Sequence, residues 1–178
     1  KAYHDITLAD GRSVSVGGIV DRLDKITVNG EQVLRIVDYK TGKYDPSKLK
    51  AEDMDDAFTN CQKRYVRQTL IYSYVVSELG NELDTLGRIG KYDRMQPILL
   101  FSYKNLTDEK TKKDIDIATA RVDNFENDYK ADTEGRLKDL LTQILDEKDF
   151  AQTGVENKEC KYCPFVKLCG KENEVSVF

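Results

Sequence analysis

Hydrophobic and polar residues alternate through the first forty positions, as expected of strands that bury one face. Residues 3–8 and 13–20 are predicted strands of this kind. Residues 26–28 and 33–39 flank Asn29-Gly30, and this dipeptide between β-prone residues is the strongest short signal for a hairpin. The amino-terminal part of the chain is therefore predicted to consist of short strands joined by tight turns.

Beyond a loop at residues 42–50, the apolar residues recur at spacings of three and four, which is typical of amphipathic helices. One long helix is predicted over residues 54–79, with Gly80 as its stop. The apolar face of this helix is formed by Phe58, Cys61, Tyr65, Tyr72, Val76 and Leu79. A second helix is predicted within residues 122–150, carried by Leu137, Leu140, Leu141, Ile144 and Leu145.

Two further strands are predicted between the helices, at residues 97–103 and, as a short edge strand, at residues 115–118. Strands followed by a helix, a strand and another helix predict an α/β fold with a mixed central sheet flanked by helices. The 178 residues are expected to form a single domain, with a core over 1–150 and a cysteine-containing tail over 151–178.

The composition, 39% hydrophobic and 34% charged residues, fits a globular protein, and no apolar run approaches the length of a membrane span. We therefore expect no membrane partner and a cytoplasmic location. The chain begins with Lys1 and shows no signal-peptide pattern, so it is expected to be a piece of a larger protein.

The net charge of −4 argues against binding nucleic acid by bulk electrostatics alone. Basic residues nevertheless gather in one part of the sequence. They are Lys40, Lys43, Lys48, Lys50, Lys63, Arg64 and Arg67. These residues form either a local basic groove or a solvated face, and the sequence leaves both interpretations open.

The chemistry-bearing residues begin at the end of the predicted strand 33–39. Asp38 and Lys40 project from the same face, because positions i and i+2 of a strand do so. A hairpin at Asn29-Gly30 would bring Asp21 back toward Asp38. Charges at a buried strand end are tolerable if they pair with each other or hold a cation, so both a salt bridge and a cation site remain possible.

Gln68 and Tyr72 lie one helical turn apart, on the helix face expected to pack toward the sheet. A glutamine on an apolar face needs a hydrogen-bond partner. Lys40, Asp38 or a phosphate of a bound substrate are the candidates, and backbone carbonyls at the edge of the core are the alternative.

Three segments in succession carry a resemblance to a known family. Gly18-Ile19-Val20-Asp21, Val37-Asp38-Tyr39-Lys40-Thr41-Gly42 and Gln68-Thr69-Leu70-Ile71-Tyr72 resemble the motifs of the RecB-like branch of the PD-(D/E)xK nuclease superfamily. This branch includes the nuclease domains of RecB and AddB-type helicase-nucleases. The resemblance implies a restriction-endonuclease-like core and a metal-dependent phosphodiesterase site.

By this resemblance, Asp21, Asp38 and the main-chain carbonyl of Tyr39 would bind Mg²⁺ or Mn²⁺. Lys40 would be the catalytic lysine beside these two aspartates. Gln68 and Tyr72 would support the lysine and the DNA backbone. Mg²⁺ prefers oxygen ligands and commonly takes one or two protein carboxylates together with substrate phosphate, so two aspartates suffice as its protein anchors.

The sequence departs from the family pattern in two places. Val37 stands where the superfamily has the proline of its name. The family commonly carries a metal-binding histidine on a helix upstream of the first aspartate. The only histidine here, His4, lies in a predicted strand instead, so it is expected to be structural or on the surface. Asp24 is expected to pair with Arg22 or, alternatively, to contact the groups that bind the metal without binding the metal itself.

The tail carries a second candidate site, the C-x2-C-P-x4-C run of Cys160, Cys163 and Cys169. Both a [4Fe-4S] cluster and a structural Cys₄ zinc site need one more ligand than these three. The run resembles the cysteine signature of AddB-type nucleases, which implies a [4Fe-4S] cluster whose fourth ligand is outside this chain. Cys61 is expected to be a free core cysteine.

The predicted function is therefore metal-dependent hydrolysis of DNA, as an exonuclease or endonuclease, in DNA repair or recombination. The expected partners are DNA and a helicase, either a separate subunit or a fused domain. Two alternatives belong to other classes. One is a catalytically silent module that binds DNA or supports a helicase, and the other is an interaction domain in which only the cysteine metal site matters.

Overall fold

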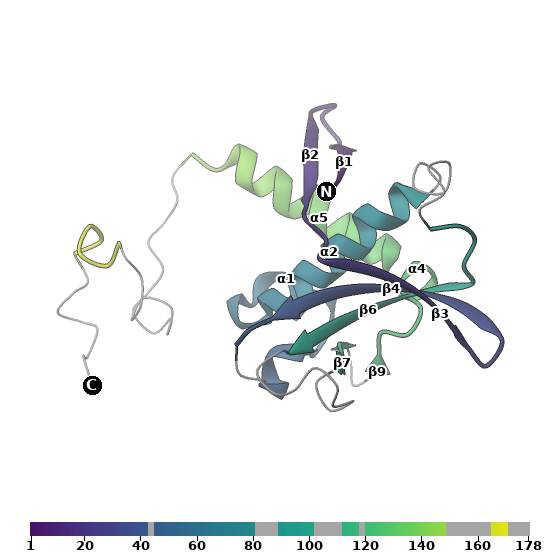
Figure 1. The fold of residues 1–178 in the computed structure, drawn as a ribbon. Helices are drawn as coiled ribbons and strands as arrows, with labels where there is room; N and C mark the ends of the chain where they lie inside the picture. The colour runs from purple at the N-terminus through teal and green to yellow at the C-terminus, as the bar shows by residue number, and fades with distance from the viewer. Residues whose placement is uncertain (43–44, 81–88, 102–111, 118–119, 149–164, 171–178) are drawn as a thin grey trace. The chain divides into compact units, whose positions relative to one another are not determined.

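The computed structural model describes residues 1–42, 45–80, 89–101, 112–117, 120–148 and 165–170 (Figure 1). By their contacts the residues divide into two compact units, 1–142 and 143–178, and the elements that follow belong to the first unit unless stated otherwise. Among the described residues, no helix combines the length and apolar character needed to cross a membrane.

Two antiparallel hairpins form the amino-terminal part. Strand β1 (Ala2–Thr7) pairs with β2 (Ser13–Gly18), and β3 (Arg22–Val28) pairs with β4 (Glu31–Lys40). The second hairpin turns through Asn29-Gly30, whose φ angles of 52° and 90° are both left-handed. Such angles define the two-residue turn that matches the twist of the flanking strands, so the prediction from this dipeptide is confirmed.

The central sheet is mixed, with strand order β3-β4-β6-β7. Strand β6 (Arg94–Phe101) runs parallel to β4, and β7 (Lys112–Asp114) runs antiparallel to β6. Strand β4 lies between two partners, and its apolar residues Val33, Leu34, Ile36 and Val37 are almost entirely buried, as expected of an interior strand. The predicted α/β fold with a mixed central sheet is confirmed.

A second, three-stranded sheet is made of very short strands, in the order β5 (Lys50–Ala51), β8 (Asp116–Ile117) and β9 (Ala120–Arg121). The strand predicted at 115–118 corresponds to β8, but its predicted place at a sheet edge is wrong, because β8 pairs with β5 on one side and β9 on the other. Residue 118 lies outside the described residues. The predicted loop at 42–50 contains a 3₁₀ turn, η1 (Pro46–Leu49), in place of continuous loop.

The single long helix predicted over residues 54–79 is wrong. The segment forms α1 (Met54–Thr59), a 3₁₀ turn η2 (Cys61–Lys63) and α2 (Arg64–Glu78). Asn60 has an extended backbone, and its side-chain oxygen accepts a hydrogen bond from the Gln62 amide, so it caps the following turn and interrupts the helix. The apolar spacing continues across this interruption, which is why periodicity alone did not reveal it.

The second predicted helix corresponds to α5 (Lys130–Asp146), which runs across the boundary between the two units, and a separate short helix, α4 (Phe125–Asp128), precedes it. Leu137 is buried, but Ile144 and Leu145 are about half exposed. The predicted apolar stripe is therefore wrong at its carboxyl-terminal end.

Helix α2 packs across β4 and β6, as Figure 1 shows. The contact is a buried apolar cluster to which all three elements contribute. Its members from these elements include Leu34, Ile36, Val66, Leu70, Met95 and Leu99. Because Leu34 and Ile36 are on the α2 side of β4, Asp38 and Lys40 project toward α2 as well.

Candidate active site

The hairpin places Asp21 at the end of β4. Arg22 pairs with Val37, so the next position along each strand sets Asp21 opposite Asp38. The exposed Asp21 carboxylate accepts a hydrogen bond from the Tyr39 amide at 2.8 Å. The Asn-Gly turn thus brings the two carboxylates to one end of the sheet.

Asp38 is a buried acid, with 4% of its surface exposed. Its Oδ2 atom lies 2.5 Å from Lys40 Nζ, and both side chains are largely shielded from solvent. Burial raises the pKa of Asp38 and nearby Asp21 raises it further, while Lys40 opposes both effects. The Oδ2 atom accepts no well-oriented hydrogen bond within the described part of the chain, so its contact with Lys40 is a close ion pair.

Gln68 connects this ion pair to α2. Its Oε1 atom accepts a hydrogen bond from Lys40 Nζ at 2.7 Å, and its Nε2 atom donates to the Tyr72 hydroxyl at 3.3 Å. Of the partners considered for this glutamine, the structure selects Lys40. A continuous polar chain therefore runs from Asp38 through Lys40 and Gln68 to Tyr72.

Tyr72 in turn lies against the end of β2. A Cβ atom added to Gly18 would stand 3.2 Å from the Tyr72 hydroxyl oxygen, which is tighter than most real contacts. The missing side chain at Gly18 therefore leaves the space that Tyr72 occupies. In this way the structure links the first and third of the three sequence segments.

Tyr65 is a further member of the site that sequence reasoning assigned only to the apolar face. Lys40 Nζ lies 4.8 Å from the centroid of the Tyr65 ring, and the Arg64 guanidinium lies 5.3 Å from the same centroid. The available signal was the position of Tyr65 on the helix, three residues before Gln68 and on the same face.

Tyr39 projects from the opposite face of β4. Its hydroxyl accepts a hydrogen bond from Arg22 Nη1 at 3.3 Å, and Arg22 Nε lies 2.5 Å from Asp24 Oδ1. Of the two roles considered for Asp24, the structure shows the pairing with Arg22.

Most of the predicted basic residues that the structure describes on and before α2 have internal partners. Lys63 Nζ donates to the Ser47 carbonyl at 2.9 Å, and Arg67 Nη1 donates to the Phe58 carbonyl at 2.8 Å, at the end of α1. Arg64 is exposed beside Tyr65. Lys63 and Arg67 thus make hydrogen bonds within the chain, the local basic groove stays a prediction, and Lys43 lies outside the described residues.

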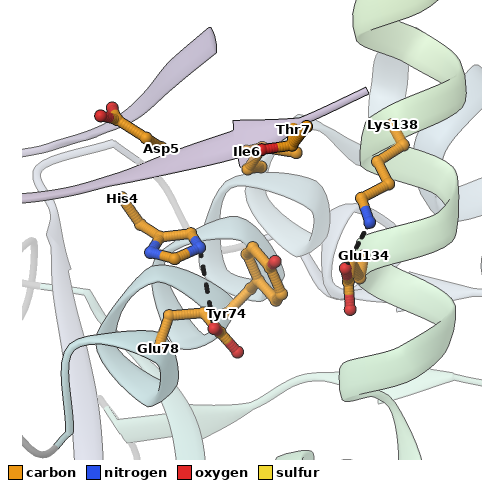
Figure 2. Close-up of a pocket in the computed structure, with 8 residues that line it drawn as sticks. All are labelled: His4, Asp5, Ile6, Thr7, Tyr74, Glu78, Glu134 and Lys138. Atoms are coloured by element: carbon orange, nitrogen blue, oxygen red, sulfur yellow. Dashed lines mark ion pairs between the residues drawn. The ribbon is translucent and has the colours of Figure 1, made fainter. Parts of the chain in front are cut away.

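His4 lies in a separate pocket of about 230 Å³ (Figure 2). Its Nε2 atom is 3.7 Å from Glu78 Oε2, and its ring meets the Tyr74 ring edge to face at 5.9 Å. Burial, with the charges of Glu134 and Glu78, raises the pKa of Tyr74 to about 12. Both contacts are made with α2 residues other than Gln68 and Tyr72, in agreement with the structural or surface role expected for His4.

Of the three cysteines in the run, the structure describes Cys169. Cys160 and Cys163 lie outside the described residues, and Cys169 is a free, partly buried cysteine. Cys61 lies partly exposed in η2 and not in the core as predicted. Within the ranges that the structure covers, no group of three or more His, Cys, Asp or Glu side chains is arranged to hold a metal ion.

Comparisons with known proteins give a family and several relatives. The profile of the PD-(D/E)XK nuclease superfamily matches residues 2–170. The chain is 31% identical over 113 residues to a protein of Clostridium perfringens strain SM101 that is named as a subunit of an ATP-dependent helicase/deoxyribonuclease. It is 30% identical over the same length to the proteins of that name from strains ATCC 13124 and 13. The aligned residues make up 62% of this chain but only 9% of each relative. No solved structure matches the chain.

Proposed function

This chain belongs to the PD-(D/E)XK nuclease superfamily, and on that premise we propose that it is a metal-dependent nuclease that hydrolyses DNA phosphodiester bonds. The observation that carries the proposal is the meeting of Asp21, Asp38 and Lys40 at the end of β4. A salt bridge alone would account for Asp38 and Lys40, but it does not involve Asp21, whose exposed carboxylate accepts from the Tyr39 amide at the same strand end.

The residues present fit a divalent cation. We propose Asp21, Asp38 and the Tyr39 carbonyl as its protein ligands, because the buried Oδ2 atom of Asp38 retains acceptor capacity and a second carboxylate lies opposite. Two carboxylates are a sufficient protein contribution for Mg²⁺ or Mn²⁺ when substrate phosphate completes the shell. A bound cation would supply Lewis acidity and positive charge at the phosphate.

Lys40 is proposed to stabilise the negative charge that develops on the phosphate during hydrolysis. A preorganised ammonium group in a water-poor site is more effective than the same group in bulk water. Gln68 holds the Lys40 ammonium at 2.7 Å, and Tyr72 holds Gln68 in turn. We therefore propose Gln68 and Tyr72 as supports for Lys40, with the DNA backbone close to them.

The names of the relatives support a finer proposal on substrate and partner. Because these proteins are called helicase/deoxyribonuclease subunits, we infer DNA as the substrate and a helicase, fused or separate, as the partner. DNA repair or recombination in the cytoplasm is the corresponding setting. Since the matched segment is a small part of each relative, these inferences concern the nuclease segment alone.

The cysteine run supports a second metal group. We propose Cys160, Cys163 and Cys169 as three ligands of a [4Fe-4S] cluster whose fourth ligand is outside this chain. Iron analysis and the visible absorption spectrum of protein purified without oxygen test this assignment. Zinc without iron would contradict it and favour a structural zinc site.

Metal removal tests the proposed reaction. The protein should cut labelled single-stranded or double-stranded DNA in Mn²⁺ or Mg²⁺, stop cutting when EDTA is added, and resume when excess Mn²⁺ is restored. The physical reason is that Asp21 and Asp38 hold the cation between them. Cutting that continues undiminished in EDTA would contradict the metal assignment, and absence of cutting under all conditions would favour a silent DNA-binding module.

Arg64 is expected to contact the DNA backbone. It is exposed at the start of α2, beside the ring that contacts Lys40, and no ion pair joins it to an acidic residue among those described. Arg64→Ala should weaken DNA binding severalfold and reduce the salt dependence of log Kd by about one, the value for a single phosphate contact. Fluorescence anisotropy in EDTA over a range of salt concentrations measures both quantities.

Arg67→Ala is the matched control, because Arg67 donates to main-chain carbonyls at the end of α1. It should lower thermal stability and leave the salt dependence unchanged. An unchanged salt dependence in Arg64→Ala would rule out the proposed phosphate contact.

A further inference from the structure

We propose that Tyr65 is a positioning residue for Lys40, and that the face of its ring keeps the Lys40 ammonium in place while Asp38 binds a cation. This role rests on the proposed nuclease function. Tyr65 lies outside the three sequence segments and would be a further residue that positions Lys40.

The surroundings of Lys40 combine an anion, an amide and a ring. Its Nζ atom lies 2.5 Å from Asp38 Oδ2, 2.7 Å from Gln68 Oε1 and 4.8 Å from the centroid of Tyr65. Only 12% of the Lys40 side chain is exposed, so water contributes little to holding its charge. An ammonium within about 6 Å of a ring centroid is attracted by the electron density of the ring face, and desolvation strengthens this attraction.

The ring matters because Asp38 has two proposed tasks. The same carboxylate is the ion-pair partner of Lys40 and a proposed ligand of the cation. When Asp38 shares its charge with a cation, its attraction for Lys40 weakens. Gln68 and Tyr65 are unaffected by this competition, since neither carries a charge that a cation would draw away.

A ring has a further advantage over another carboxylate at this place. It attracts the ammonium without neutralising it. The full positive charge of Lys40 therefore remains available to a phosphate. A second acid in place of Tyr65 would instead repel the phosphate and Asp38.

Tyr65 is itself held in position. Its ring meets the Phe101 ring edge to face, with centroids 6.3 Å apart and an angle of 71° between the planes. Phe101 is the β6 residue paired with Lys40 in the parallel register. Tyr65 and Gln68 are three residues apart on α2, so one helix face presents both to Lys40.

The test uses the full 178-residue chain and three variants. Tyr65→Leu removes the ring face, Tyr65→Phe keeps it, and Tyr74→Leu makes the same change elsewhere on α2, where Tyr74 packs on His4. Two quantities are compared below the unfolding temperature of every variant: the single-turnover rate of cleavage of an end-labelled oligonucleotide in Mn²⁺, and the Kd for that DNA in EDTA.

Tyr65→Leu should cleave about tenfold more slowly with an unchanged Kd, because a cation–π contact in a shielded site contributes on that scale. Tyr65→Phe and Tyr74→Leu should cleave within about twofold of the wild type. Tyr65→Leu cleavage equal to that of the wild type, or reduced no more than in Tyr74→Leu, would overturn the positioning role and leave the nuclease proposal intact.

A second readout does not depend on cleavage. In NMR spectra of protein with isotope-labelled lysine, the ring should shift the Lys40 Hε protons upfield in the wild type and in Tyr65→Phe, but not in Tyr65→Leu. Absence of this shift from the wild type would overturn the proposal directly. If the ring shift is present but the wild type cuts no DNA, the nuclease proposal fails, and the positioning role fails with it.

Discussion

Asp38→Asn is expected to lose at least about a hundredfold in the rate of DNA cleavage, because removal of one group that stabilises transition-state charge costs about 10² to 10³. Asparagine has nearly the same size as aspartate, so the change removes the charge and leaves the packing of β4 in place. The buried Asp38 carboxylate contacts Lys40 and is a proposed ligand of the cation.

The same variant should bind Mn²⁺ more weakly, since one of two proposed carboxylate ligands is lost. Isothermal titration with Mn²⁺ measures the binding, and a circular dichroism spectrum shows that the fold is retained. Unchanged Mn²⁺ binding would remove Asp38 from the proposed set of ligands.

Lys40→Met is expected to reduce cleavage about a hundredfold and also to destabilise the protein. Methionine preserves the length of the side chain but leaves the Asp38 carboxylate buried without its cationic partner. Breaking a buried ion pair on one side typically costs about 3–5 kcal/mol. Urea denaturation in EDTA at pH 7.5, beside the cleavage assay, measures both effects.

The destabilisation should depend on pH in a defined direction. The pKa of Asp38 is already raised by burial, and Lys40 opposes that rise, so removing Lys40 raises the pKa further. An acid whose pKa is higher in the folded state makes that state bind more protons, and the free energy of unfolding then falls as pH increases through this range. Lys40→Met should therefore lose less stability at pH 5 than at pH 7.5. An equal loss at both pH values would contradict the account of the ion pair.

The hairpin of β3 and β4 was predictable because its information is local. Asn29-Gly30 supplies two left-handed residues, and the register that follows sets Asp21 opposite Asp38. The face shared by Asp38 and Lys40 follows from strand geometry alone. The two acids and the lysine could thus be brought together from the sequence without knowledge of the rest of the sheet.

Other features depended on contacts that periodicity does not encode. The helix interruption at Asn60 arises from a side-chain cap, while the apolar spacing runs on unbroken. Arg67 binds main-chain carbonyls of residues 57, 58 and 60 at this interruption, and Lys63 binds the Ser47 carbonyl in η1. Neither contact follows from the pattern of basic residues along the sequence.

At the site, the contact of Tyr65 with Lys40 is likewise not encoded by the periodicity of the sequence. An aromatic residue on an apolar helix face is expected to be core, and Tyr65 does pack against the core. Its second contact, with Lys40, exists because α2 crosses the end of β4. That crossing is a tertiary feature, so the sequence offered only the position of Tyr65 on the same helix face as Gln68.

The central claim is that the end of β4 is a nuclease site, and single-turnover cleavage of an end-labelled oligonucleotide in Mn²⁺ tests it most directly. The wild type is compared with Asp38→Asn and with Asp24→Asn, the latter a nearby acid that pairs with Arg22. We predict cleavage by the wild type and Asp24→Asn, and loss of at least about a hundredfold in Asp38→Asn. Equal cleavage by all three proteins would contradict the account.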